Sequence, residues 1–290
     1  MAKIMQLSRL TSLDLGGTPL RYFRPRAAAE LRAALAECCR EGIPWRVLGG
    51  GSNLLIDDGP LPYAVVHVTG AAFGRIARTG LRTVTAGAGA ATARLLATCK
   101  ENGLGGLEFL AGLPGTVGGA VAGNAGAWGR QVSDPLSRLR LMRPDGRTLS
   151  VPAREVDFSY RSADLNGCIV MEAEFALEPR DRRLIARQMD TYARARAERH
   201  PLGGHSAGCI FKNPPRASAG RLLDLCGLKG RRIGGAQVSH KHANFILNRG
   251  GATAGDVLAL IAVMEQAVRL RFGIQLELEV RHWPAQERAA

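Results

Sequence analysis

Residues 110–126 read LAGLPGTVGGAVAGNAG, a run with no charged side chain and too much glycine for an ordinary core helix. Glycine lets a ligand lie directly on the main chain, and successive amides form concave sites for phosphate oxygens. Pro114, Gly115 and Thr116 read as a turn before a helix start, whose amides attract anions. The run therefore indicates a site for a phosphorylated ligand. A tight structural loop packed with small residues is the alternative.

A second glycine turn, GGGSN at residues 49–53, lies between the apolar runs 45–48 and 54–56. This pattern predicts a strand, a turn and a second strand. Ser52 and Asn53 add side chains that can hydrogen-bond a ligand. Two glycine loops at strand ends favour one extended ligand with an anionic middle.

Length and composition indicate a soluble protein of two or three small domains, with 290 residues of which 46% are hydrophobic. No apolar run approaches the roughly 20 residues of a membrane span, and the first residues lack a signal-peptide core. We therefore expect a cytoplasmic protein with no membrane partner. The six cysteines form no CxxC pair, so we predict free thiols and no metal site.

The net charge of +14 raises the alternative of a nucleic-acid-binding protein. The basic residues are not clustered, however, and only 5% of the residues are aromatic. A basic background serves anionic small molecules equally well. We therefore predict no nucleic-acid partner.

The segment 82–102 resembles the entry to a dinucleotide-binding fold without completing it. A strand at 82–86 runs through Gly87, Ala88 and Gly89 into a helical pattern at 90–102. The fingerprint needs a small residue where Thr92 stands, and an acidic residue about 20 positions later, which this chain lacks. The sequence argues against that fold.

The remaining periodicities predict a mixed α+β chain that is mostly antiparallel in its middle. Pro144-Asp145-Gly146 is a hairpin signal. The C-terminal GIQLELEVRH alternates with a period of two, which is typical of a strand. We expect helices at 27–40, 182–199, 218–226 and 254–272, and strands at 64–68, 136–142, 147–151, 169–177, 244–248 and 274–282.

The ordered motifs resemble the UDP-N-acetylenolpyruvoylglucosamine reductase family of peptidoglycan precursor synthesis, in its shorter type. They cover nearly the whole chain and read GGGSNLL, AGAG, LAGLPGTVGGAVAGNAGAWG, DFSYRSADL, SAGCIFKNP, AGRLLDLCGLKG, GGAQVSHKHANFILN and LELEV. Each motif alone is weak, and their order makes the resemblance specific. Another FAD oxidoreductase of the same fold class remains the alternative enzyme.

The resemblance implies the two-subdomain FAD-binding fold of the vanillyl-alcohol oxidase class, plus a smaller α+β substrate-binding domain. We place the subdomains at 1–78 and 79–180 and the substrate-binding domain at 181–273. Whether a C-terminal strand at 274–284 returns to the first subdomain is left open. The implied cofactors are FAD and NADPH. In the implied reaction, a hydride passes from NADPH through the flavin to C3 of UDP-N-acetylglucosamine enolpyruvate, and a proton arrives at C2.

The family's cofactor contacts fall on the glycine loops and on one strand of this chain. The residues implied as FAD-binding are Gly49, Gly50, Gly51, Ser52, Asn53, Leu54, Gly87, Ala88, Gly89, Gly112, Leu113, Pro114, Gly115, Thr116, Gly118, Gly119, Asn124, Ala125, Gly126, Ile169 and Val170.

Three residues match the catalytic positions of the family. Arg161 and Glu279 are implied to stabilise the negative charge that develops on the enolpyruvyl carboxylate. A guanidinium can donate two parallel hydrogen bonds to a carboxylate, which lysine cannot copy. A surface ion pair for Arg161 and a solvated edge-strand carboxylate for Glu279 are the alternatives.

Cys209 stands where the family usually has the serine that donates the proton. A free thiol has a pKa of about 8.5, so it can still protonate an enol at neutral pH. A buried cysteine that only fills space is the alternative. The resemblance also implies Tyr160, Lys212, Asn213 and His242 as substrate contacts, with cap and surface roles as the alternative for Lys212 and Asn213. The oligomeric state is left open, and a monomer is favoured.

Overall fold

The structure is a computed structural model that describes residues 5–286 of the 290-residue chain. Its internal contacts divide it into two compact units. Unit 1 comprises the described residues of Met1–Leu20, Gly51–Pro62 and Ala197–Ala290, and unit 2 comprises Arg21–Gly50 and Tyr63–Arg196. The three domain ranges expected from the sequence stay a prediction.

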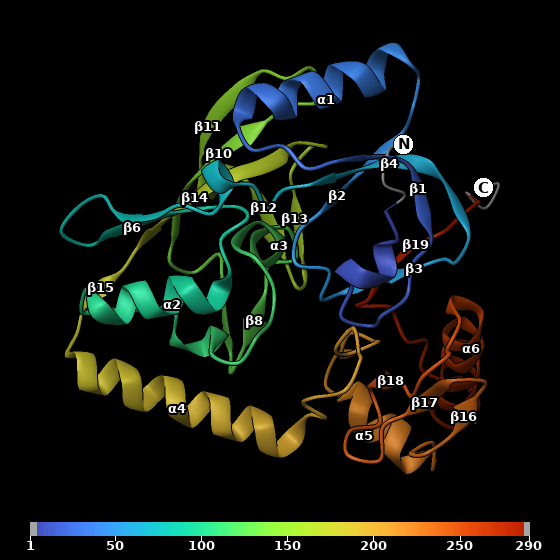
Figure 1. Ribbon diagram of the computed structural model, residues 1–290. Coiled ribbons are helices and arrows are strands. Elements are labelled where there is room, and N and C mark those ends of the chain that lie inside the picture. Colours follow the sequence, from blue (N-terminus) through green and yellow to red (C-terminus); the bar gives the residue numbers. More distant parts are fainter. Residues whose placement is uncertain (1–4, 287–290) are drawn as a thin grey trace. The chain divides into compact units, whose positions relative to one another are not determined.

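Unit 2 is built on a five-stranded antiparallel sheet in the order β11-β10-β14-β6-β5 (Figure 1). The predicted Pro-Asp-Gly hairpin is confirmed, because Leu139 pairs with Val151 across it. The predicted antiparallel middle of the chain is confirmed as well. The strands are β5 (Ile76–Arg78), β6 (Thr83–Gly87), β10 (Leu136–Met142), β11 (Thr148–Pro152) and β14 (Ile169–Ala176).

The helices of unit 2 bury one apolar stripe each. In α1, residues Leu31, Leu35 and Cys38 lie on the inner side, and in α2 residues Leu95 and Leu96 do the same. The side chains of Leu31, Leu35, Leu95 and Leu96 share one core with the sheet. The helices α1 (Ala28–Arg40), α2 (Thr92–Glu101), α3 (Val117–Ala122) and α4 (Arg182–Arg199) confirm the predictions at 27–40, 90–102 and 182–199.

The GGGSN turn follows β2 (Trp45–Leu48) and precedes β3 (Leu54–Ile56), as predicted. The two strands do not form a hairpin. In unit 2, β2 pairs in parallel with β4 (Pro60–His67), and in unit 1, β3 pairs in parallel with β19 (Arg281–Trp283). The turn therefore connects two separate sheets.

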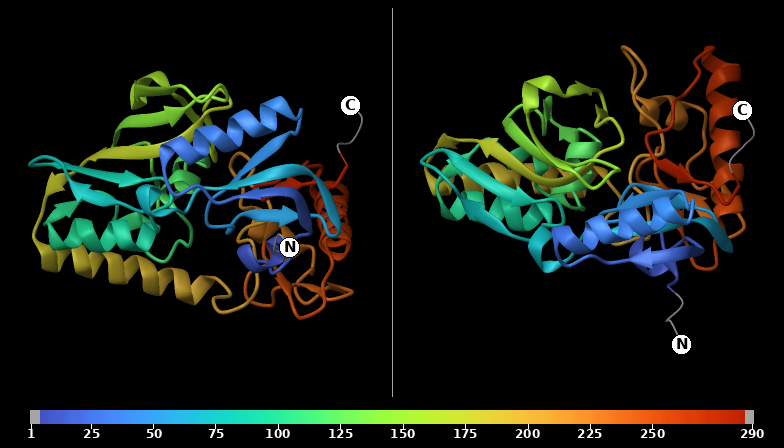
Figure 2. Two further views of the ribbon diagram at one scale, coloured as in Figure 1. Left: turned by 45° about the horizontal axis from the view of Figure 1, so that its top comes forward. Right: turned by 90° about the horizontal axis from the view of Figure 1, so that it is seen from above.

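Unit 1 contains a small sheet in the order β16-β17-β18, with α6 packed against β16 and β17. Figure 2 shows α6, in red, beside the orange strands of the same unit in both views. A capping box of Thr253 and Asp256 starts α6, and Gly273 ends it with φ +67°. The elements are α5 (Ala219–Leu225), α6 (Ala254–Phe272), β16 (Arg232–Ile233), β17 (Ala236–Val238) and β18 (Ile246–Asn248).

The strand predicted at 274–282 is wrong over most of its length. Only β19 joins a ladder, although the alternation of burial holds, with Leu276 and Val280 buried and Glu277 exposed. The segment runs extended, with a single bridge between Leu278 and Phe211. Beside this bridge, the amide of Lys212 donates to the carbonyl of Glu277 at 2.8 Å.

The remaining short elements complete the two units. Among residues 5–286, no helix combines the length and apolar character needed to cross a membrane. The elements are η1 (Leu7–Leu10), β1 (Thr18–Phe23), η2 (Ala71–Phe73), β7 (Leu104–Gly105), η3 (Glu108–Leu110), β8 (Gly126–Ala127), β9 (Arg130–Gln131), η4 (Ala153–Glu155), β12 (Asp157–Ser159), β13 (Ser162–Asp164) and β15 (Glu178–Pro179).

Candidate functional site

Three glycine segments meet backbone against backbone through residues of unit 2. A Cβ atom added to Gly50 would lie 2.8 Å from Cα of Gly115, and one added to Gly118 would lie 2.8 Å from Cβ of Ala88. Such contacts are closer than side chains tolerate. The GGGSN turn, the AGAG segment and the LAGLPGTVGG segment therefore come together, and close packing explains part of their glycine content.

The amides of these segments have different partners. At the start of α3, the amides of Val117 and Gly118 donate to the carbonyls of Ala90 (2.9 Å) and Ala88 (2.8 Å). These two amides are therefore used within the protein, and anion binding at this helix start stays a prediction. Within residues 5–286, the amides of Gly49 and Gly50 donate to no protein oxygen. A ligand oxygen can use these two amides, and those of Gly115 and Thr116 likewise donate to no protein oxygen within the described residues.

Arg161 lies in unit 2 at the tip of a hairpin. Strands β12 and β13 pair at Ser159 and Ser162, which leaves Tyr160 and Arg161 as a two-residue turn. Arg161 has φ +61°, a conformation that costs energy in a residue with a side chain. Its Nη1 donates to the carbonyl of Gly126 at 2.7 Å, and its guanidinium lies 5.4 Å from the ring centre of Tyr160. A strained residue with a defined side-chain contact is typical of functional sites.

Asn124 ties this hairpin to the glycine-rich segment. Its side chain is 1% exposed, and Nδ2 donates to the carbonyl of Ser159 and to Oε1 of Gln131, both at 3.0 Å. Its Oδ1 accepts from the amide of Ser133 at 3.3 Å. These bonds use the side-chain amide within the protein, and the backbone amide of Asn124 donates to the carbonyl of Val121 at 3.0 Å, so a cofactor contact of Asn124 stays a prediction. Two further predicted FAD contacts, Ile169 and Val170, are buried in β14.

Unit 1 brings together Asn53, Cys209 and Glu279. The amides of Glu279 (2.8 Å) and Val280 (3.3 Å) both donate to the carbonyl of Ile210, the residue after Cys209. Two successive amides on one carbonyl make a β-bulge, a device that re-aims side chains next to active sites. Nδ2 of Asn53 donates to the carbonyl of Glu279 at 3.0 Å. Arg161 belongs to unit 2, and its meeting with Cys209 and Glu279 stays a prediction.

The predicted substrate contacts in unit 1 also have structural partners. The ammonium of Lys212 pairs with the carboxylate of Glu277. Oδ1 of Asn213 accepts from the amide of Ala219 at 3.0 Å, where α5 begins. These are the surface and cap roles named above as the alternative, and they leave substrate binding by both residues a prediction.

His242 is half-buried in an aromatic group. Its ring meets that of His200 edge-on, with centres 5.2 Å apart, and that of Phe245 at 5.0 Å. Burial, and next the charge of Lys229, lower the pKa of His242. Nδ1 accepts from the amide of Asn244 at 3.2 Å, as a neutral ring allows. No cluster suited to a metal ion occurs among residues 5–286, and His240 and His242 both lie outside the strands.

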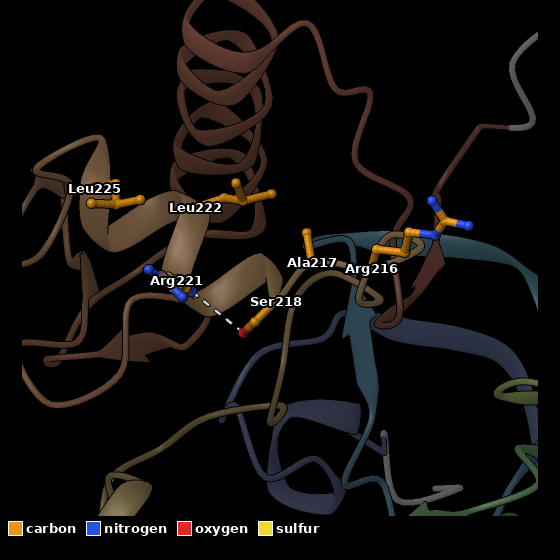
Figure 3. Close-up of a pocket in the computed structure, with 6 residues that line it drawn as sticks. All are labelled: Arg216, Ala217, Ser218, Arg221, Leu222 and Leu225. Carbon is orange, nitrogen blue, oxygen red and sulfur yellow. Dashed lines mark hydrogen bonds between the residues drawn. The ribbon is translucent and has the colours of Figure 1, made fainter.

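A cavity of about 600 Å³ opens beside α5 in unit 1 (Figure 3). Its lining combines two arginines with apolar side chains, which suits a ligand carrying both an anionic and an apolar part. Arg221, Leu222 and Leu225 of this lining belong to the motif AGRLLDLCGLKG, to which the sequence analysis assigned no binding role. The lining residues are Arg216, Ala217, Ser218, Arg221, Leu222 and Leu225.

Replacing Gly118 with alanine is expected to destabilise the cofactor-free protein by about 1–3 kcal/mol, because the new Cβ meets Ala88. Gly119 is the matched control in the same helix, since its added Cβ would come no closer than 3.5 Å to Thr116 Oγ1. Gly119→Ala is expected to be neutral or to stabilise by up to about 1 kcal/mol. Urea unfolding followed by circular dichroism compares the two. Equal midpoints would contradict the packing argument.

Lowering the pH below about 6.5 is expected to reduce the melting temperature. Burial lowers the pKa of both His67 and His242, so near pH 6 the unfolded chain binds protons that the folded chain does not. The stabilisation is complete above the unfolded pKa and is lost as the pH falls through the folded values. His67→Gln and His242→Gln should each flatten the dependence. The exposed His240→Gln should leave it unchanged.

The chain matches two known families. Residues 200–283 match the family described as UDP-N-acetylenolpyruvoylglucosamine reductase, C-terminal domain, and residues 19–152 match the family described as FAD binding domain. These matches confirm the predicted fold class.

Curated relatives extend the similarity over almost the whole chain. A UDP-N-acetylenolpyruvoylglucosamine reductase from Geobacter metallireducens is 43% identical over 276 residues, covering 95% of this chain and 91% of the relative. The enzyme of that name from Pelobacter propionicus is 40% identical, with coverages of 95% and 92%. The crystal structure of the Thermus caldophilus reductase matches with a TM-score of 0.84 at 37% identity, covering 97% of this chain and 98% of that one.

Proposed function

The chain belongs to the UDP-N-acetylenolpyruvoylglucosamine reductase family, and on this premise we propose that it converts UDP-N-acetylglucosamine enolpyruvate to UDP-N-acetylmuramate in peptidoglycan precursor synthesis. The proposed cofactor is FAD and the proposed reductant is NADPH. The proposal includes a cytoplasmic, monomeric enzyme, with FAD-binding subdomains at 1–78 and 79–180 and a substrate-binding domain at 181–273.

The observation that carries this proposal is the meeting of the glycine segments in unit 2. No side chain separates Gly50 from Gly115, and the amides of Gly49 and Gly50 have no protein acceptor within the described residues. Adjacent amides on bare backbone suit the oxygens of a pyrophosphate. The residues present therefore fit FAD, whose pyrophosphate is the anionic middle of an extended ligand. When bound, FAD would supply the two-electron chemistry through which the hydride of NADPH reaches C3 of the enolpyruvyl group.

Arg161 and Glu279 are proposed to stabilise the charge that spreads over C2 and the carboxylate of the substrate. The guanidinium of Arg161 is planar and always charged, so it can hold the carboxylate through two hydrogen bonds. Its contact with the Gly126 carbonyl, at 2.7 Å, limits the directions that the guanidinium can take. Glu279 sits in the bulge beside Ile210, where its side chain can orient the same group.

Cys209 is proposed to give the proton to C2. The thiol must be protonated to act as a general acid, and its half-buried position leaves it accessible to a substrate. Tyr160, Lys212, Asn213 and His242 are proposed as substrate contacts. Lys212 would then exchange its ion pair with Glu277 for the diphosphate of the substrate.

Two measurements test the proposed function. The purified protein should be yellow, with FAD released on denaturation, and a colourless protein that cannot be reconstituted with FAD would leave the nucleic-acid-binding alternative. NADPH should be oxidised only when UDP-N-acetylglucosamine enolpyruvate is present. Oxidation that depends on a different substrate would instead favour another FAD oxidoreductase of the same fold class.

A further inference from the structure

His67 occupies an unusual place at the end of β4. It is 8% exposed, and its chain neighbours Val66 and Val68 are fully buried core residues. It pairs with Leu48 in the parallel ladder, directly before the GGGSN turn. Burying an imidazole among valines costs free energy unless both ring nitrogens find partners.

Both nitrogens do find partners in unit 2. Nε2 of His67 lies 3.1 Å from the carbonyl of Gly49, and Nδ1 lies 2.6 Å from the hydroxyl of Tyr22 on β1. A carbonyl oxygen can only accept, so Nε2 carries the hydrogen and donates to Gly49. In a neutral ring Nδ1 is then the acceptor, and the hydroxyl of Tyr22 donates to it.

The surroundings keep both groups in these protonation states near neutral pH. Burial, and next the charge of Arg24, lower the pKa of His67. Burial also raises the pKa of Tyr22, so its hydroxyl keeps its proton. The series from Tyr22 through His67 to Gly49 therefore has one consistent direction of donation.

The anchored carbonyl determines where the next amide points. In a trans peptide the C=O and N–H bonds point in opposite directions, and residues 5–286 contain no cis peptide. Holding the Gly49 carbonyl toward His67 turns the amide of Gly50 to the opposite side. That amide has no protein acceptor within the described residues, and Gly50 packs against Gly115 of the second glycine segment.

We propose that His67, held by Tyr22, is a positioning residue that fixes the peptide between Gly49 and Gly50 so that the Gly50 amide donates to an oxygen of the FAD pyrophosphate. The inference rests on the proposed function, because FAD is the ligand assumed for the loop. A pre-oriented amide binds without first losing conformational freedom, so the effect is on cofactor affinity. No sequence motif marks His67, since only the β2–β4 ladder brings it to Gly49.

The test measures FAD affinity of the cofactor-free protein by quenching of flavin fluorescence. His67→Leu removes both hydrogen bonds and is expected to weaken FAD binding about tenfold, the equivalent of one hydrogen bond of about 1.4 kcal/mol. His67→Gln is expected to stay within about threefold of the parent, because a glutamine amide can reach the position of Nε2 and donate from it. Tyr22→Phe, which removes a single hydroxyl, is expected to weaken binding about threefold.

The melting temperature of each cofactor-free variant separates positioning from a general structural role. A lower melting temperature in His67→Leu with unchanged FAD affinity overturns the inference. Equal weakening in His67→Leu and His67→Gln overturns it too, because the donor then has no effect. If His67→Leu does not fold, the test uses Tyr22→Phe, in which an unchanged FAD affinity would overturn the inference. A parent protein that binds no FAD refutes the proposed function itself, a result distinct from these.

Discussion

Replacement of Cys209 with alanine is expected to lower turnover of UDP-N-acetylglucosamine enolpyruvate by about 10²–10⁴-fold, the usual cost of removing a general acid. Reduction of bound FAD by NADPH should proceed at the parental rate, because that step needs no proton at C2. Stopped-flow absorbance at the flavin band measures the two half-reactions separately. A variant impaired equally in both half-reactions would point to damage of the whole site.

Replacement of the same residue with serine is expected to change the pH profile more than the rate. The thiol donates only while protonated, so activity with Cys209 should fall as the pH rises through the pKa of the thiol. A serine hydroxyl does not titrate in this range, and Cys209→Ser should lack the alkaline decline while it retains turnover. Identical profiles for the two proteins would contradict the donor role.

Alkylation tests independently whether the thiol of Cys209 is needed for activity. Burial raises the pKa of Cys38, Cys168 and Cys226, and raises that of Cys99 to about 12, so these four react slowly. Cys39 is exposed and would compete for the reagent, so Cys39→Ser is the suitable background. In that background, iodoacetamide should inactivate the enzyme, and substrate should protect it. Labelling of Cys38 or Cys226 with activity retained would be the contrary result.

Arg161→Lys is expected to reduce kcat/KM by about 10²-fold although it conserves the charge. A lysine ammonium cannot present two parallel donors to the carboxylate, so the transition state loses part of its stabilisation. The loss should appear in the oxidative half-reaction with substrate. The reduction of FAD by NADPH should change little. An unchanged kcat/KM in Arg161→Lys would show that catalysis does not need the two parallel hydrogen bonds of the guanidinium.

The backbone of Arg161 offers a matched control. A backbone φ of +61° strains an arginine but not a glycine. Arg161→Gly should therefore fold at least as stably as the parent while it loses activity. Thermal melting and steady-state kinetics on the same preparation test both parts. A large drop in melting temperature would mean that the contact with Gly126 stabilises the fold more than the strain weakens it.

Local patterns were sufficient for most of the elements. The long helices at 182–199 and 254–272 have the predicted bounds, because charge pattern and caps define their ends. The fold class followed from the family resemblance, which the order of the motifs along the whole chain carries. The helix and strand signals, in contrast, act between residues that are close in sequence.

Features that depend on distant partners were not predictable in this way. The amides of Val117 and Gly118 are taken by residues of another segment, which no motif reports. Periodicity identified the inward side chains near the C-terminus, but whether that segment joins a ladder depends on a neighbour far away in sequence. His67 was missed for the same reason, since its role depends on a parallel pairing.

Because β3 pairs with β19, a strand that is synthesised early can complete this pairing only after almost the whole chain has been made. Until Arg281 pairs with Leu54, β3 lacks its parallel partner, and Glu279, which lies just before Arg281 in the chain, is among the last residues to be added. Such distant contacts slow folding. We therefore expect prematurely terminated chains to be inactive, so that only complete translation products can contribute to cell-wall synthesis.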